Sequence, residues 1–84
     1  MTEPFQRAVS PAVPLEKRRA AIDALAAEGR ASDLAVLVRT RGLPGGLRRE
    51  AIGGLATCHA DEELAAVAAD TSLPPAIRRT AKQR

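Results

Sequence analysis

Paired arginines are the residues of this chain whose type and spacing most clearly suggest a binding chemistry. The pair Arg-Arg occurs three times, each time 30 residues after the last, as Arg18-Arg19, Arg48-Arg49 and Arg78-Arg79. A guanidinium is planar and permanently charged, and it donates paired hydrogen bonds to carboxylates and phosphates. The spacing therefore indicates three similar structural units, each carrying a group suited to an acidic partner.

The other reactive side chains do not form a catalytic or metal-binding set. Cys58 and His59 are adjacent, and consecutive helical residues point about 100° apart, so the two side chains do not meet as a dyad. The chain has one Cys and one His, too few for the usual zinc sites. Asp61, Glu62 and Glu63 suit the first turn of a helix, where the helix dipole favours acids. We therefore expect no enzyme activity, no bound metal and no cofactor.

The arginine pairs belong to a longer repeated pattern. Prolines, alanines and aliphatic residues recur at the same interval: Pro14, Pro44 and Pro74; Ala21, Ala51 and Ala81; Ile22 and Ile52; Leu25 and Leu55; Leu43 and Leu73. A fixed period of about 20 to 50 residues is typical of stacked repeat proteins. Ile22, Ile52 and Ile77 are expected to occupy matching buried places in successive layers.

Each repeat is predicted to be a helical hairpin. Helical spacing of apolar residues, with Pro near each start and Gly near several ends, predicts five main helices at about 14–28, 32–41, 44–58, 61–71 and 74–84. Ser32 is the expected N-cap of the second. Gly53 and Gly54 are unusual in mid-helix, and we interpret them as a close approach by a neighbouring helix, with a bend as the alternative.

The N-terminal part is less regular. Residues 1–13 form an irregular or short helical segment, because Phe5 and Val9 have helical spacing but prolines interrupt the stretch. We therefore divide the chain into this segment and a repeat domain at 14–84.

Two segments resemble the junction between successive HEAT-like repeats: LPGGLRREAIGGL at 43–55 and ADTSLPPAIRRTA at 69–81. The similarity is to the short bacterial subclass with repeats of about 30 residues, and it extends over roughly 14–84, with Lys17 in the first copy where an aliphatic residue belongs. The resemblance implies an all-α fold, a short α-solenoid of about two and a half hairpins preceded by a possible N-terminal turn. It also implies that the chain binds other macromolecules.

The first arginine of each pair is predicted to be structural. Ala51, Ile52 and Leu55 follow Arg48 by three, four and seven residues, so Arg48 lies on the inward face of its helix. In HEAT-like repeats this arginine bridges to a neighbouring repeat, often to a junction aspartate. The resemblance thus implies an inter-repeat role for Arg18, Arg48, Arg78 and Asp70.

The second arginine of each pair is predicted to face outward. Arg19, Arg49 and Arg79 are expected to form a column, one per repeat, about 8–10 Å apart, with Lys82 beside it. Such a column suits an acidic protein or a phosphate backbone. The alternative is that these arginines are solvated side chains that only keep the protein soluble. With one aromatic residue, the chain lacks the platforms that stack single-stranded bases.

Composition limits the setting. The net charge is +3 and the sequence pI is about 10.0, a mild basicity that permits acidic partners without requiring them. The single Cys58 excludes an internal disulfide, residues 1–10 carry no signal-peptide pattern, and no stretch approaches the roughly 18 apolar residues that span a bilayer. We expect a soluble, cytoplasmic protein that does not enter membranes.

The stack also has little room for capping repeats. At least one end of the stack is expected to expose an apolar patch suited to self-association, formed by Phe5 and Val9 at one end or by Leu73, Ile77 and Ala81 at the other. The sequence therefore predicts a non-catalytic interaction module, a scaffold or adaptor that binds through its concave surface or an exposed end. Binding of a nucleic-acid phosphate backbone is the alternative.

Overall fold

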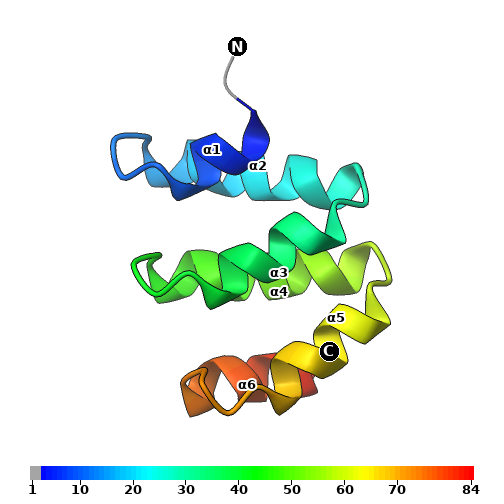
Figure 1. Cartoon of the computed structure of the whole chain (residues 1–84). Helices are drawn as coiled ribbons and strands as arrows, with labels where there is room; N and C mark the ends of the chain where they lie inside the picture. Colours follow the sequence, from blue (N-terminus) through cyan, green and yellow to red (C-terminus); the bar gives the residue numbers. More distant parts are fainter. Residues whose placement is uncertain (1–2) are drawn as a thin grey trace.

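Six α-helices follow one another in the computed structural model, which describes residues 3–84 (Figure 1). They are α1 (Pro4–Val9), α2 (Leu15–Ala27), α3 (Ala31–Arg39), α4 (Gly45–Thr57), α5 (Asp61–Ala69) and α6 (Pro75–Lys82). No strand occurs within 3–84, which confirms the all-α prediction. Residues 1–2 of the predicted N-terminal segment lie outside the described residues.

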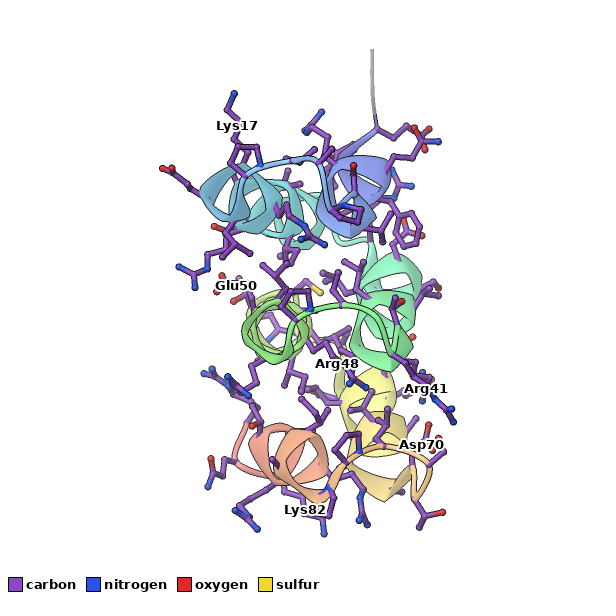
Figure 2. All side chains as sticks on the ribbon, turned by 90° about the vertical axis from the view of Figure 1, so that its left-hand side faces the viewer. Lys17, Arg41, Arg48, Glu50, Asp70 and Lys82 are labelled. Atoms are coloured by element: carbon purple, nitrogen blue, oxygen red, sulfur yellow. The ribbon has the colours of Figure 1, made fainter. Side chains whose placement is uncertain are left out.

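The helices form three hairpins stacked in two layers. Helices α1 and α2, α3 and α4, and α5 and α6 pack as pairs, and α2, α4 and α6 lie one above the next on one side of the molecule (Figures 1 and 2). Helix α1 packs on α2 as α3 packs on α4. The short N-terminal helix therefore completes a first hairpin, and the stack has three hairpins where two and a half were predicted.

Apolar side chains from every hairpin meet in one continuous core. The largest fully buried residues are Ile22, Leu25, Leu34, Leu37, Val38, Leu47, Ile52, Leu55 and Val67. Ile77 is buried too, but by the 30-residue step it takes the place of Leu47, so Ile22 and Ile52 match each other and not Ile77. The helices of 3–84 include none long and apolar enough to cross a membrane.

The turn from each second helix into the next hairpin is a Schellman motif. At the end of α2, the N–H of Arg30 donates to the carbonyl of Leu25 and the N–H of Gly29 to that of Ala26. Helix α3 then begins directly, with Arg30 as its N-cap and no side-chain cap. The predicted Ser32 cap is therefore wrong, because the Schellman turn starts the helix two residues earlier.

Glycines of α4 divide into two kinds. A Cβ at Gly54 would lie 3.3 Å from Ala26 Cβ and from both Leu34 Cδ atoms, so the predicted close approach by neighbouring helices holds for this residue. Gly53 is half-exposed and its Cβ would meet only the Arg84 side chain, at 3.6 Å. Core packing therefore explains Gly54 but not Gly53.

The predicted apolar patch at the C-terminal end is wrong. Leu73, Ile77 and Ala81 are 5%, 3% and 5% exposed, so they belong to the core. Lys82 stands in the register of Ile22 and Ile52, and it projects at the end of the stack (Figure 2).

Lysine occupies the corresponding place at the opposite end. Lys17 stands in the register of Leu47 and Ile77 and is exposed there (Figure 2). Phe5 and Val9 are half-buried against the core. At both ends of the stack an ammonium group therefore replaces an aliphatic side chain that stands at the same register in the other hairpins.

His59 offers a test of the Schellman turn between α4 and α5. It occupies the position of Gly29 in the second Schellman turn and has φ 58°, against 68° for Gly29. Because a side chain is strained at positive φ, His59→Gly is expected to raise the free energy of unfolding by about 0.5–1 kcal/mol, measured by urea denaturation. Gly29→Ala, the matched reverse change, should lower it by about 1 kcal/mol. A less stable His59→Gly variant would show that the imidazole makes contacts that outweigh the strain.

Candidate protein-binding surface

The first arginine of a pair can hydrogen-bond to the other helix of its own hairpin. Arg18 and Arg48 are 6% and 7% exposed, and their Nε atoms donate to the main-chain oxygens of Ala8 at 3.0 Å and Val38 at 2.8 Å. Both acceptors lie in the last turn of the helix that precedes the arginine's own helix. These hydrogen bonds therefore run within a hairpin, whereas the resemblance to HEAT-like repeats implied bridges between repeats.

The carbonyl groups at the end of α3 show what this contact does. The last turn of any helix leaves carbonyls without intrahelical partners. Here Thr40 Oγ1 donates to Val36 O at 2.7 Å, Thr40 N donates to Leu37 O at 3.1 Å, and Arg48 Nε donates to Val38 O at 2.8 Å. The guanidinium also places a positive charge at the negative end of the helix dipole.

The third hairpin departs from this arrangement. Arg78 is half-buried, and its Nε donates to Leu73 O in the turn, at 3.2 Å, instead of to the helix end. The arginine of the last hairpin thus has a looser setting than Arg18 or Arg48.

Asp70 does link two hairpins, but through a different arginine. Its Oδ2 accepts from Arg39 Nε at 2.9 Å, and its Oδ1 accepts from Ser72 N at 3.0 Å and Ser72 Oγ at 2.6 Å. The Ser72 hydroxyl, Arg39 and the Ser72 N–H together lower the pKa of Asp70 to about 2. The carboxylate therefore stays ionised as it joins the end of α3 to the end of α5.

The second arginines of the pairs are exposed, as their position one residue further round the helix requires. Arg19, Arg49 and Arg79 stand at the same register of α2, α4 and α6, and Lys82 is exposed at the end of α6. Arg79 and Lys82 line one hollow together with Pro75 and Arg78. All four side chains are therefore exposed, and the binding column itself stays a prediction.

Two carboxylates interrupt this column. Glu50 of α4 lies beside Asp23 of α2, and its pKa is raised by partial burial and then by hydrogen bonding to Asp23 and the charge of that group. Arg19 and Arg84 attract the ionised form and oppose this shift. The groove between α2 and α4 therefore holds two acids and two bases, and Arg19 already faces an acid.

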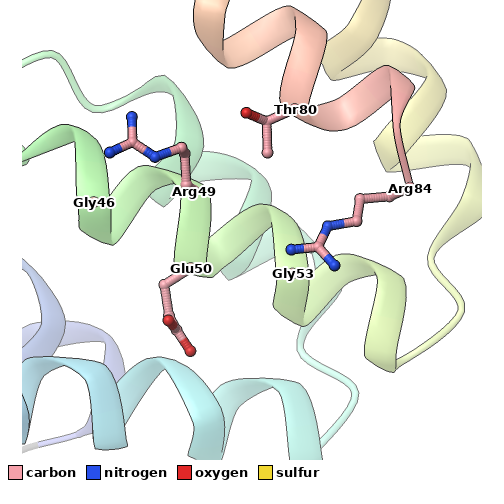
Figure 3. Close-up of a pocket in the computed structure, with 6 residues that line it drawn as sticks. All are labelled: Gly46, Arg49, Glu50, Gly53, Thr80 and Arg84. Atoms are coloured by element: carbon pink, nitrogen blue, oxygen red, sulfur yellow. The ribbon is translucent and has the colours of Figure 1, made fainter.

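The groove between α4 and α6 differs in charge. A hollow of ≈ 330 Å³ is lined there by Gly46, Arg49, Glu50, Gly53, Thr80 and Arg84 (Figure 3). In this view Glu50 points toward α2, while Arg49 and Arg84 project from different sides of the hollow. A second hollow of ≈ 410 Å³, over the α2–α4 groove, shares Glu50, Gly53 and Arg84 with the first. The open, positive part of the layer thus lies toward α6.

Sequence reasoning missed the pair of Asp23 and Glu50, although the signal was present. Adding the 30-residue step to 23 gives 53, and 50 lies one helical turn before 53 on the same side of the helix. A charged residue in the second helix of one hairpin therefore lies near the residue that follows it by one repeat period minus one helical turn, in the second helix of the next hairpin.

No metal site accompanies these charges. Within 3–84, no group of three or more His, Cys, Asp or Glu side chains is placed to hold a metal ion. Cys58 is half-buried, and its thiol donates to the Leu55 carbonyl at 3.7 Å. What the layer offers is charge and hydrogen bonding.

Fold and surface together define an all-helical stack of hairpins with a charged face. No family model matches the chain, and no curated protein or solved structure gives a significant match. The resemblance of 43–55 and 69–81 to HEAT-like repeats therefore stays a prediction.

The contact between Arg48 and Val38 predicts a large effect of a small change. Arg48→Met keeps most of the apolar stem but leaves a buried carbonyl unpaired, so the free energy of unfolding should fall by about 2–3 kcal/mol in urea denaturation. Arg49→Met, the same change at the exposed neighbour, should alter it by less than about 0.5 kcal/mol. Equal effects of the two substitutions would show that Arg48 contributes only bulk.

The pair of Asp23 and Glu50 predicts a pH dependence. Because the folded state raises the pKa of Glu50 above its ordinary 4.5, the folded protein holds this proton more tightly than the unfolded chain. The associated stability is present below about pH 4.5 and is lost as pH rises through the raised pKa. Glu50→Gln removes this loss, so its stability relative to wild type should increase from about pH 4 to about pH 7, reaching about 0.5 kcal/mol. An advantage that shrinks toward neutral pH would contradict the assignment.

Proposed function

We propose that this chain is a non-catalytic interaction module whose α2–α4–α6 layer binds an acidic segment of another protein. The supporting observation is that Arg49, Arg79 and Lys82 are exposed and form no ion pair with any residue of 3–84. By contrast, Arg30 pairs with Asp33 at 2.7 Å and Arg39 with Asp70 at 2.9 Å. Arg30 and Arg39 thus use Asp33 and Asp70, whereas Arg49, Arg79 and Lys82 remain available to an acidic partner.

The fold supports a scaffold or adaptor role more than a reaction. The stack presents its side chains from the outer faces of regular helices, and solenoid surfaces of this kind serve for binding. The HEAT-like assignment belongs to the same proposal and is supported by the 30-residue repeat of prolines and arginines. A bacterial cytoplasmic setting is supported by the resemblance to the short bacterial repeats and by the single cysteine.

Nucleic acid is the second candidate, and the acid pair disfavours it. A duplex presents one negative charge per about 1.7 Å of its axis, so it repels any acid beneath it. Asp23 and Glu50 lie between the arginines of α2 and those of α4 and α6. A protein segment can place its acids over α4 and α6 alone, and is therefore the better fit.

Titrations followed by NMR test this proposal at the level of single residues. ¹⁵N-labelled protein is titrated with poly-L-glutamate and, separately, with a random-sequence DNA duplex at several salt concentrations. We expect poly-L-glutamate to shift amides of α4 and α6, and Arg49→Gln to weaken binding about two- to fivefold. Arg41→Gln is the matched control, because Arg41 projects from the α3–α4 turn on the other side of the molecule (Figure 2).

The two probes separate the candidates. Tighter duplex binding that weakens steeply with salt and depends on Arg49 would favour the phosphate-backbone reading. Binding to neither probe at low salt would remove both.

A further inference from the structure

A hollow on α6, at the end of the stack, is lined by three cations and by no acid. It measures ≈ 340 Å³, and its lining consists of Pro75, Arg78, Arg79 and Lys82. Two guanidiniums and one ammonium give this lining a charge of +3. The hollows over the α2–α4 and α4–α6 grooves, by contrast, both include Glu50. The end of α6 therefore offers an anion positive charge that no lining carboxylate offsets.

The order of these residues along α6 places the cations on three sides of one spot. Pro75 and Lys82 are seven residues apart, about two helical turns, so they lie along one line of the helix. Arg78 and Arg79 come between them and leave the helix about 100° apart, one to each side of that line. The spot above the short ring of Pro75 thus has an arginine on either side and Lys82 toward the C-terminal end of α6.

The donors of these cations are largely unused. Arg78 Nε donates to Leu73 O at 3.2 Å, but the two Nη atoms of Arg78 form no hydrogen bond or ion pair within 3–84. The side chains of Arg79 and Lys82 are exposed and form none either. Like charges three and four residues apart on a helix repel each other, and both arginines stand in this relation to Lys82. A bound anion would occupy the donors and relieve the repulsion.

The 30-residue repeat does not account for this cluster of cations. Ile22 and Ile52 stand at the register of Lys82, and both are fully buried. Arg48, at the register of Arg78, is 7% exposed and reaches the end of α3, whereas Arg78 is half-buried and stays in its turn. The open cluster is thus particular to α6.

Charge and shape favour a phosphate monoester over a carboxylate as the ligand. A carboxylate carries one charge and two oxygens, which a single arginine binds in bidentate fashion. A phosphate monoester carries about −1.5 to −2 charges at pH 7 and presents three oxygens in different directions. Three cations on three sides of one spot match the monoester. The phosphates of a nucleic-acid backbone carry one charge each, so they match the cluster less well.

We propose that this hollow is a site for the phosphate of a phosphorylated serine or threonine in the partner segment, held by Arg78, Arg79 and Lys82. The inference rests on the proposed function, because Arg79 and Lys82 belong to the layer that binds the acidic segment. It adds a regulation, since phosphorylation of the partner then strengthens its binding at the α6 end of the layer.

Three blocked acidic peptides test the ligand. They share one sequence and differ at a single central residue, which is phosphoserine, glutamate or serine. NMR titration of ¹⁵N-labelled protein should show the phosphoserine peptide binding at least about threefold more tightly than the glutamate peptide, with its shifts centred on the amides of α6. Inorganic phosphate, titrated separately, should bind at least about tenfold more weakly than the phosphoserine peptide, because it lacks the acidic segment.

Matched lysine variants locate the site. Lys82→Gln and Lys17→Gln each remove one exposed ammonium, and the two lysines lie at opposite ends of the stack (Figure 2). We expect Lys82→Gln to weaken binding of the phosphoserine peptide about two- to fivefold and Lys17→Gln to leave it unchanged. Arg79→Gln should act like Lys82→Gln. Because all three side chains are exposed, each variant should unfold at the urea concentration of wild type.

The outcomes separate this site from the proposed function. Equal affinity for the phosphoserine and glutamate peptides overturns the assignment to phosphate. Equal losses in Lys82→Gln and Lys17→Gln overturn the site, because overall charge alone would then explain binding. Inorganic phosphate that binds as tightly as the phosphoserine peptide overturns the assignment to a partner segment. If poly-L-glutamate binding still depends on Arg49 in these cases, the proposed function stands without the phosphate site.

Discussion

The structure depends on a guanidinium that holds the end of one helix to the start of the next. Arg18 and Arg48 each reach from the first turn of the second helix of a hairpin to a carbonyl ten residues earlier, in the last turn of the first helix. A buried charge is costly unless it is hydrogen-bonded, so this contact restricts the two helices to a small range of relative positions. The proline at each N-cap, with φ between −57° and −53°, sets the direction in which the second helix leaves the turn.

The same contact determines which side chains remain outside. When Arg48 turns inward, Arg49 lies about 100° round the helix and must face outward beside the groove. The repeat of the structural arginine therefore carries a repeat of exposed arginines with it. The hairpins differ in the acids that lie near these arginines. Glu50 faces Arg19, whereas Arg49 and Arg79 form no ion pair with any residue of 3–84.

Periodic features of the molecule were predictable from the sequence, and features that depend on contact between layers were not. The 30-residue step located all five main helices to within a few residues and placed Arg19, Arg49 and Arg79 outside. It did not show that Arg48 binds Val38, because a main-chain acceptor has no signature in the residue types. It did not indicate that Lys17 and Lys82 cover the ends, since that requires knowing which faces of the helices meet a neighbour. The Ser32 cap failed because the Schellman turn, formed by main-chain hydrogen bonds alone, made a side-chain cap unnecessary.

The two grooves of the α2–α4–α6 layer differ in charge. In the α2–α4 groove, Arg19 and Arg84 offset Asp23 and Glu50, and the pKa of Glu50 is raised first by partial burial and then by its interaction with Asp23, against the attraction of the two arginines. An acidic partner gains nothing by entering that groove, because it would meet repulsion as strong as the attraction. Helix α6 carries no acid, and Gly46 and Gly53 on the facing side of α4 have no side chains. Arg79 and Lys82 of α6 are exposed. The physical difference between the two adjacent grooves thus comes from three residues of α4, the glycines at 46 and 53 and the glutamate at 50, none of which recurs at the equivalent positions of α2.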